Sequence, residues 1–138
     1  MYPTKEKILK RLPSIKRYAL KFIKSWEGNW KLSKNSEMKK FESLQYMLKN
    51  LGNIYDKPVR VKYIRENSSA YYNTGNRTIY LNKPLSIISA LHEFAHHIFG
   101  NSELQACRWS ISIFSKAFPK AYDKLQWKGH MLIKRKRL

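Results

Sequence analysis

The sequence is poor in the residues that would mark several protein classes. Its single cysteine excludes a disulfide within the chain, and we interpret it as a packing residue. Five glycines, five prolines and 43% hydrophobic residues argue against a low-complexity or disordered chain. No apolar run approaches the roughly 18 residues of a membrane span. Lysines interrupt the first residues, so a signal peptide is not indicated, and we expect a soluble, cytoplasmic protein.

Acidic residues are also scarce, because 9 of them stand against 28 lysines and arginines, a formal net charge of +19. Such a chain attracts polyanions through counterion release whether or not it recognises them. The basic residues are densest at 5–24 and 128–137. No zinc-finger, helix-turn-helix or RNA-binding motif is present. Nucleic acid is therefore one candidate partner, and a merely lysine-rich surface is the alternative.

The most informative stretch is Leu-His-Glu-Phe-Ala-His-His-Ile-Phe-Gly at 91–100, which contains the pattern H-E-x-x-H. Apolar residues recur at helical spacing from Pro84, which we expect to begin a helix, and Gly100 is a typical stop. On a helix His92 and His96 stand one turn apart on the same face and can hold one Zn²⁺.

Glu93 has a different predicted role, because it lies about 100° round the helix from His92. It cannot easily join the ligand set, but it can accept a proton from an activated water, as a metal-assisted hydrolase requires. The alternative is a helix that carries its histidines on a solvent-exposed face. Three of the four histidines lie within six residues, which favours the metal interpretation.

A catalytic zinc site needs a third protein ligand, and Glu103 is the candidate. In a continuous helix it would lie about 10 Å beyond His96, too far to share an ion. We therefore predict a turn at residues 100–102 and a second helix from about Ser102 to Ala117, which returns Glu103 to the histidines. The alternative is an ordinary glutamate in the first turn of that helix.

The sequence gives less definite roles to His97 and to the other polar residues near the motif. His97 points about 100° away from His96, which favours a supporting or packing role over metal ligation. A donor for a developing oxyanion is not identified by the sequence. The candidates are Tyr71, Tyr72, Arg108, Tyr122 and His130.

The periodicity predicts an α+β fold, and the length of the chain is that of one domain. Helices are expected over residues 15–26, ended by Gly28-Asn29, and from Ser36 to Gly52, with a short one at 120–126. Strands are expected at 59–64, 70–72 and 78–81, the last two joined as a hairpin. We divide the chain into a basic helical extension packed on the core (1–35), a metallopeptidase core (36–127) and a basic tail (128–138).

The motif His92-Glu93-x-x-His96, followed by Glu103-x-x-Ala106-x-x-Trp109, resembles the gluzincin branch of the zincin metallopeptidases. The resemblance covers roughly residues 36–118 and is greatest to minigluzincins and ImmA/IrrE-type domains. It implies N-terminal helices, a small three-stranded mixed sheet, a metal helix and a second helix with the third ligand. The gap from His96 to Glu103 is shorter than gluzincins usually have, and it is also similar to a metzincin signature lengthened by one residue.

The expected function is that of an endopeptidase with one zinc ion per chain and Glu93 as general base. We expect the extended peptide substrate to add to an exposed strand, formed by Thr78, Ile79, Tyr80 and Leu81. Two alternatives are kept. One is a nucleic-acid-associated protease resembling SprT/Spartan-type proteins, and the other is a non-catalytic zincin fold that serves as a DNA-binding or regulatory module.

Overall fold

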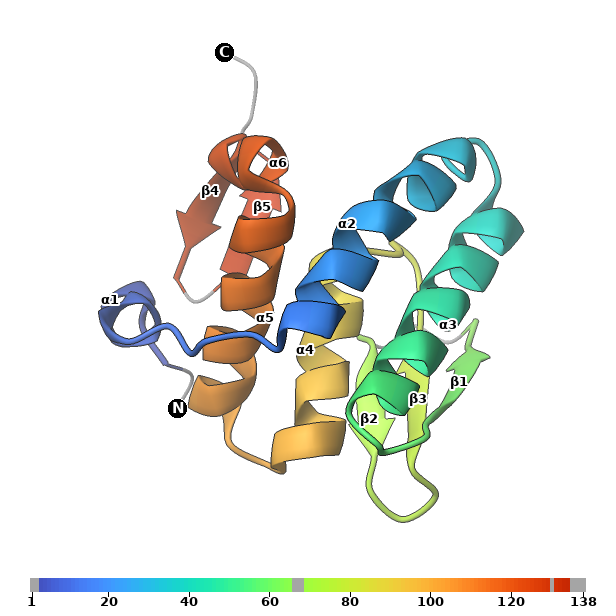
Figure 1. The fold of residues 1–138 in the computed structure, drawn as a ribbon, viewed down its shortest axis with the longest axis horizontal. Helices are drawn as coiled ribbons and strands as arrows, with labels where there is room; N and C mark the ends of the chain where they lie inside the picture. Colours follow the sequence, from blue (N-terminus) through green and yellow to red (C-terminus); the bar gives the residue numbers. More distant parts are fainter. Residues whose placement is uncertain (1–2, 66–68, 130, 135–138) are drawn as a thin grey trace.

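The computed structural model describes residues 3–65, 69–129 and 131–134 and has an α+β fold (Figure 1). Its helices are α1 (Lys5–Lys10), α2 (Arg17–Leu32), α3 (Glu37–Ile54), α4 (Ile87–Phe99), α5 (Glu103–Ala117) and α6 (Pro119–Asp123). Its strands are β1 (Arg60–Tyr63), β2 (Tyr71–Asn73), β3 (Thr78–Leu81), β4 (Leu125–Lys128) and β5 (Met131–Lys134). None of the described helices combines the length and hydropathy that crossing a bilayer requires.

The larger sheet has the strand order β1-β3-β2. Strand β1 runs parallel to β3, while β2 and β3 form the predicted antiparallel hairpin, so the sheet is small and mixed as expected. Because β3 is hydrogen-bonded to a neighbour on each side, the prediction that Thr78–Leu81 offers an exposed edge is wrong. The second strand of the hairpin has the more strongly apolar pattern, and it therefore occupies the centre of the sheet, with all but Tyr80 buried.

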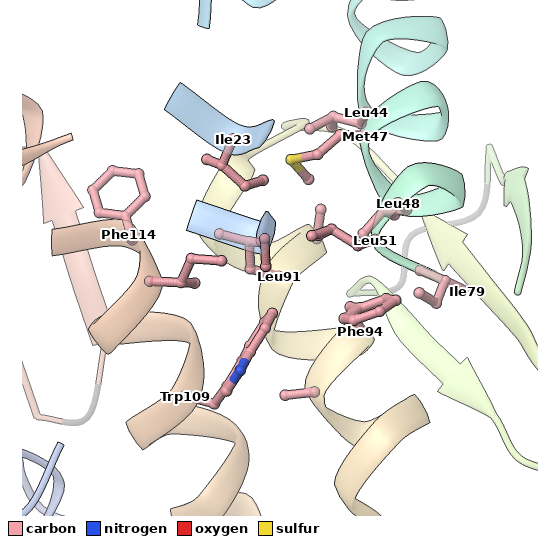
Figure 2. Packing of buried hydrophobic residues seen from close by; sticks show 14 of the residues in the cluster. Ile23, Leu44, Met47, Leu48, Leu51, Ile79, Leu91, Phe94, Trp109 and Phe114 are labelled. Carbon is pink, nitrogen blue, oxygen red and sulfur yellow. The ribbon is translucent and has the colours of Figure 1, made fainter. Parts of the chain in front are cut away.

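Helix α4 lies at the centre of the main hydrophobic core (Figure 2). Its Leu91 and Phe94 are fully buried and meet Trp109 from α5, Leu51 from α3 and Ile79 from the sheet. Fully burying an aliphatic or phenyl side chain contributes roughly 1.5–3 kcal/mol. The apolar face of α4 is thus fixed against three elements, which determines where its polar face points.

Two glycines that were expected to end helices lie inside them instead. Helix α2 continues through Gly28 to Leu32, because Trp26 is buried and Trp30 packs against the core on either side of the glycine. Helix α3 continues past Gly52 to Ile54. A Cβ at Gly52 would lie 2.9 Å from the Lys57 carbonyl oxygen, so this glycine serves a close approach of the backbone rather than a stop.

The C-terminal region differs from the predicted helix over 120–126. Helix α6 ends at Asp123. Strand β4 then pairs antiparallel with β5, and Trp127 of β4 lies opposite Leu132 of β5. Leu125 and Trp127 are half-buried while the residues between and after them are exposed, a period of two that favours a strand. This hairpin and α1 pack near α5, where Ile8 is fully buried in a second hydrophobic cluster.

Candidate metal centre

Helix α4 begins at Ile87, three residues after the predicted start at Pro84. The Ser86 hydroxyl accepts a hydrogen bond from the Ser89 N–H at 3.3 Å and satisfies an amide that lacks a helical partner. The predicted end is confirmed, because Gly100 follows the last helical residue with a φ of 96°, a conformation that disfavours any side chain.

The predicted turn after Gly100 and the second helix are also confirmed. The Ser102 hydroxyl accepts a hydrogen bond from the Gln105 N–H at 3.2 Å, and Glu103 is the first residue of α5. The two helices pack side by side (Figure 1). The turn therefore places Glu103 beside the histidine face of α4.

The structure brings together all three predicted metal ligands. One carboxylate oxygen of Glu103 lies 3.1 Å from His92 Nε2, and the other lies 2.7 Å from His96 Nε2. The imidazole centroids are 4.9 Å apart. One donor atom from each residue can be chosen so that all three lie within 4.8 Å of one another. Two imidazoles and one carboxylate are the donor set of many catalytic zinc sites, so the residues present fit this metal.

The outer nitrogen of His96 is held by the turn. Its Nδ1 lies 2.8 Å from the Gly100 carbonyl oxygen, which can only accept, so Nδ1 carries the proton and donates. Nε2, which faces Glu103, is then the nitrogen that would present its lone pair to a metal ion bound between the two side chains. Gly100 thus ends α4 and also orients the ring of the candidate ligand His96.

Cys107 has a position that its sequence context did not indicate. It is buried with Ile8 and Ile111, as a packing residue should be, but its sulfur also lies 3.9 Å from His92 Nδ1. The pKa of Cys107 is raised to about 11, chiefly by burial and also by the charges of Glu103 and Glu93. The residue therefore remains a neutral thiol beside the candidate ligand His92.

Glu93 lies outside the donor cluster but lines the same cavity as His92 and Glu103. The pKa of Glu93 is raised to about 7, and burial is the largest cause of this net increase. The charge of His96 lowers this pKa, the charge of Glu103 raises it, and a backbone hydrogen bond from Tyr72 lowers it. A carboxyl group with a pKa near neutrality can both accept and return a proton.

The cavity has a volume of about 530 Å³ and opens beside the cluster. Its walls come from α4, α5, the segment leading into β2, and β5. Ala70 and Tyr71 contribute the β2 side, and Leu132 contributes the β5 side. Among the described strands β2 is an outer strand of the sheet, with β3 on one side only, and its Tyr71 lines the cavity.

His97 connects three segments on another side of α4. Its Nε2–H donates to the Lys57 carbonyl oxygen at 2.8 Å, which leaves Nδ1 to accept from the Tyr72 hydroxyl at 2.8 Å. Burial lowers the pKa of His97, so the neutral imidazole is favoured. As predicted, His97 lies outside the donor cluster and has a packing role.

The structure narrows the oxyanion candidates. The Tyr72 hydroxyl donates to His97, and the Arg108 guanidinium donates twice to the Lys7 carbonyl oxygen, at 2.7 and 3.1 Å. Tyr122 packs against both hydrophobic clusters, and His130 lies outside the described residues. Tyr71 is the candidate that lines the cavity.

No protein-family model matches this chain, and no curated protein or solved structure shows significant similarity to it.

Proposed function

We propose that this chain is a zinc-dependent endopeptidase of the zincin class, with the closest resemblance to gluzincins. The observation that carries the proposal is the Glu103 carboxylate, which reaches the Nε2 atoms of both His92 and His96 from the next helix. Glu93 lies at the same cavity without joining the donor cluster. A helix that merely carries histidines on a solvent-exposed face would require neither the returning helix α5 nor the partly buried Glu93 carboxyl group.

In this proposal His92, His96 and Glu103 hold the metal. A zinc ion supplies Lewis acidity toward a peptide carbonyl and makes water more acidic. The Glu93 carboxylate accepts a proton from the attacking water and passes it to the nitrogen of the leaving amine. Its pKa of about 7 suits both transfers near neutral pH. Tyr71 is the proposed hydrogen-bond donor to the carbonyl oxygen.

The substrate is proposed to bind along β2 instead of β3. An extended peptide that adds to an outer strand is held by main-chain hydrogen bonds. Among the described strands, β2 pairs only with β3 and its Tyr71 lines the cavity, whereas β3 is paired on both sides. This arrangement accepts a backbone of any sequence and leaves side-chain preference to the cavity walls.

The test compares four proteins for bound zinc and for hydrolysis of unfolded casein. We expect Glu93→Gln to retain one zinc ion per chain and to lose about 10²- to 10⁴-fold in rate. His92→Ala should lose both zinc and hydrolysis, because only two ligands remain. Glu42→Gln removes an exposed carboxylate on α3 and should match the wild type.

Two results would contradict the proposal. One is a wild-type protein that binds no zinc. The other is a Glu93→Gln variant that cleaves casein at the wild-type rate with its zinc in place. Zinc binding without any cleavage would instead favour a zincin fold that serves as a binding module.

A further inference from the structure

The outward face of α2 carries a row of basic residues. Arg17, Lys21, Lys24 and Lys31, here called the α2 basic stripe, are all exposed. At 100° and 1.5 Å per residue they fall within an arc of about 80° and span roughly 21 Å of the helix axis. The opposite face carries Ala19, Ile23 and Trp26 in the core. The stripe therefore faces away from the protein.

Internal electrostatics do not account for the stripe. Within residues 3–65, 69–129 and 131–134, no carboxylate lies within ion-pair distance of Arg17, Lys21 or Lys24. Lys31 lies 3.6 Å from Glu27, but the two side chains are 72% and 41% exposed, and such surface pairs contribute little. Mutual repulsion along one helix face is unfavourable. The charges are thus available to an external anion.

The α2 basic stripe contains Gly28, and no contact with the described residues requires a glycine at this position. Gly28 lies between Lys24 and Lys31 on the same face, and a Cβ added there would meet no atom of the described residues within 4 Å. Its backbone is helical, so the glycine weakens the helix without allowing any special conformation. A bare backbone at this place lets a partner approach the helix closely.

We propose that the α2 basic stripe binds the phosphodiester backbone of nucleic acid. One strand carries a phosphate about every 3.4 Å, so a row of about 21 Å spans roughly six phosphates. An anionic membrane fits less well, because a membrane-surface helix inserts its apolar face and that face of α2 is buried in the core. This proposal uses no residue of the metal centre and stands apart from the peptidase proposal.

The experiment measures binding of the full chain to a fluorescent 20-nucleotide single strand and to the matching duplex, over a range of salt concentrations. The test variant is Arg17→Gln/Lys21→Gln/Lys24→Gln. The control is Lys49→Gln/Lys62→Gln/Lys120→Gln, which removes three exposed charges from α3, β1 and α6 and so has the same net charge. Circular dichroism checks that each variant is folded.

We expect the slope of log K against log salt to become shallower by about 2.7 for the duplex and about 2.1 for the single strand in the test variant. The control should keep the wild-type slope. Stronger binding of the single strand than of the duplex would indicate that bases also stack on the neighbouring Tyr18, which is 74% exposed. Stronger binding of the duplex would indicate contacts to the phosphodiester backbone alone.

Equal weakening of both triple variants would overturn the proposal, because it would show an effect of net charge without a site. An unchanged slope in the test variant would also overturn it. So would anionic phosphatidylserine vesicles that bind the wild type more tightly than either oligonucleotide and lose that binding in the test variant, since the stripe would then face a membrane.

Discussion

Replacing Glu103 by glutamine tests the metal centre through its effect on stability. Without zinc the change weakens contacts of 3.1 and 2.7 Å to the two histidines. The Glu103 side chain is 37% exposed, so solvent screens these contacts, and we expect a loss of about 1 kcal/mol or less. The variant should therefore be almost as stable as the wild type in the presence of a chelator.

Zinc should stabilise the wild type much more than it stabilises the Glu103→Gln variant. At a zinc concentration of 100 Kd, a one-site ligand stabilises the wild type by about 2.7 kcal/mol. If the carboxamide weakens binding about 100-fold, the variant gains only about 0.4 kcal/mol at the same concentration. For a chain of this length 1 kcal/mol shifts the melting temperature by about 4 °C. The expected zinc-induced shifts are about 11 °C for the wild type and about 2 °C for the variant.

The assay is thermal unfolding followed by circular dichroism, first with chelator and then with a fixed excess of zinc. Glu42→Gln serves as the control and should shift like the wild type. An equal zinc-induced shift in wild type and Glu103→Gln would show that the ion binds without this carboxylate. The predicted ligand set would then be wrong.

Three further predictions concern the scaffold and are measured by urea unfolding. Leu91→Ala empties a fully buried position at the centre of the core and should lower the free energy of unfolding by about 2–5 kcal/mol. Ser102→Ala removes the N-cap of α5 and should cost about 1 kcal/mol. Gly52→Ala forces a methyl group to within 2.9 Å of the Lys57 carbonyl, and we expect a net loss of about 1–2 kcal/mol, because overpacking outweighs the gain in helix propensity.

Each of these changes has a matched control. Leu91→Met keeps most of the volume and should cost less than about 1.5 kcal/mol. Ser102→Asp keeps a capping oxygen and should retain wild-type stability. Gly28→Ala places its methyl group in open space and should stabilise the chain by about 0.5–1 kcal/mol. A Gly52→Ala variant as stable as Gly28→Ala would refute the argument from backbone approach.

The candidate site was largely predictable because its geometry is local. His92 and His96 are related by one helical turn, and Gly100 and Ser102 have residue types that end one helix and begin the next. These short-range rules were enough to place Glu103 against the histidines. The same rules could not reveal the sulfur of Cys107 behind His92, since this contact depends on how two helices rotate against each other.

The sheet was predictable in its strands but not in their order. A period of two identifies a strand, but it does not identify the neighbours of that strand. The assignment of the free edge to Thr78–Leu81 failed because β1 pairs with β3 and leaves β2 outside. The glycine errors have a similar origin, because packing of Trp26 and Trp30 overrides the local tendency of Gly28 to end a helix.

The two hydrogen bonds of His97 have a consequence for the neighbouring residue His96. They tie α4 to β2 through Tyr72 and to the loop before β1 through Lys57, so the helix cannot turn about its long axis without breaking both. The direction of the two donor imidazoles is thereby set from outside the site. Binding of a metal ion, as proposed above, would then require little additional ordering of this helix, because that ordering occurs during folding.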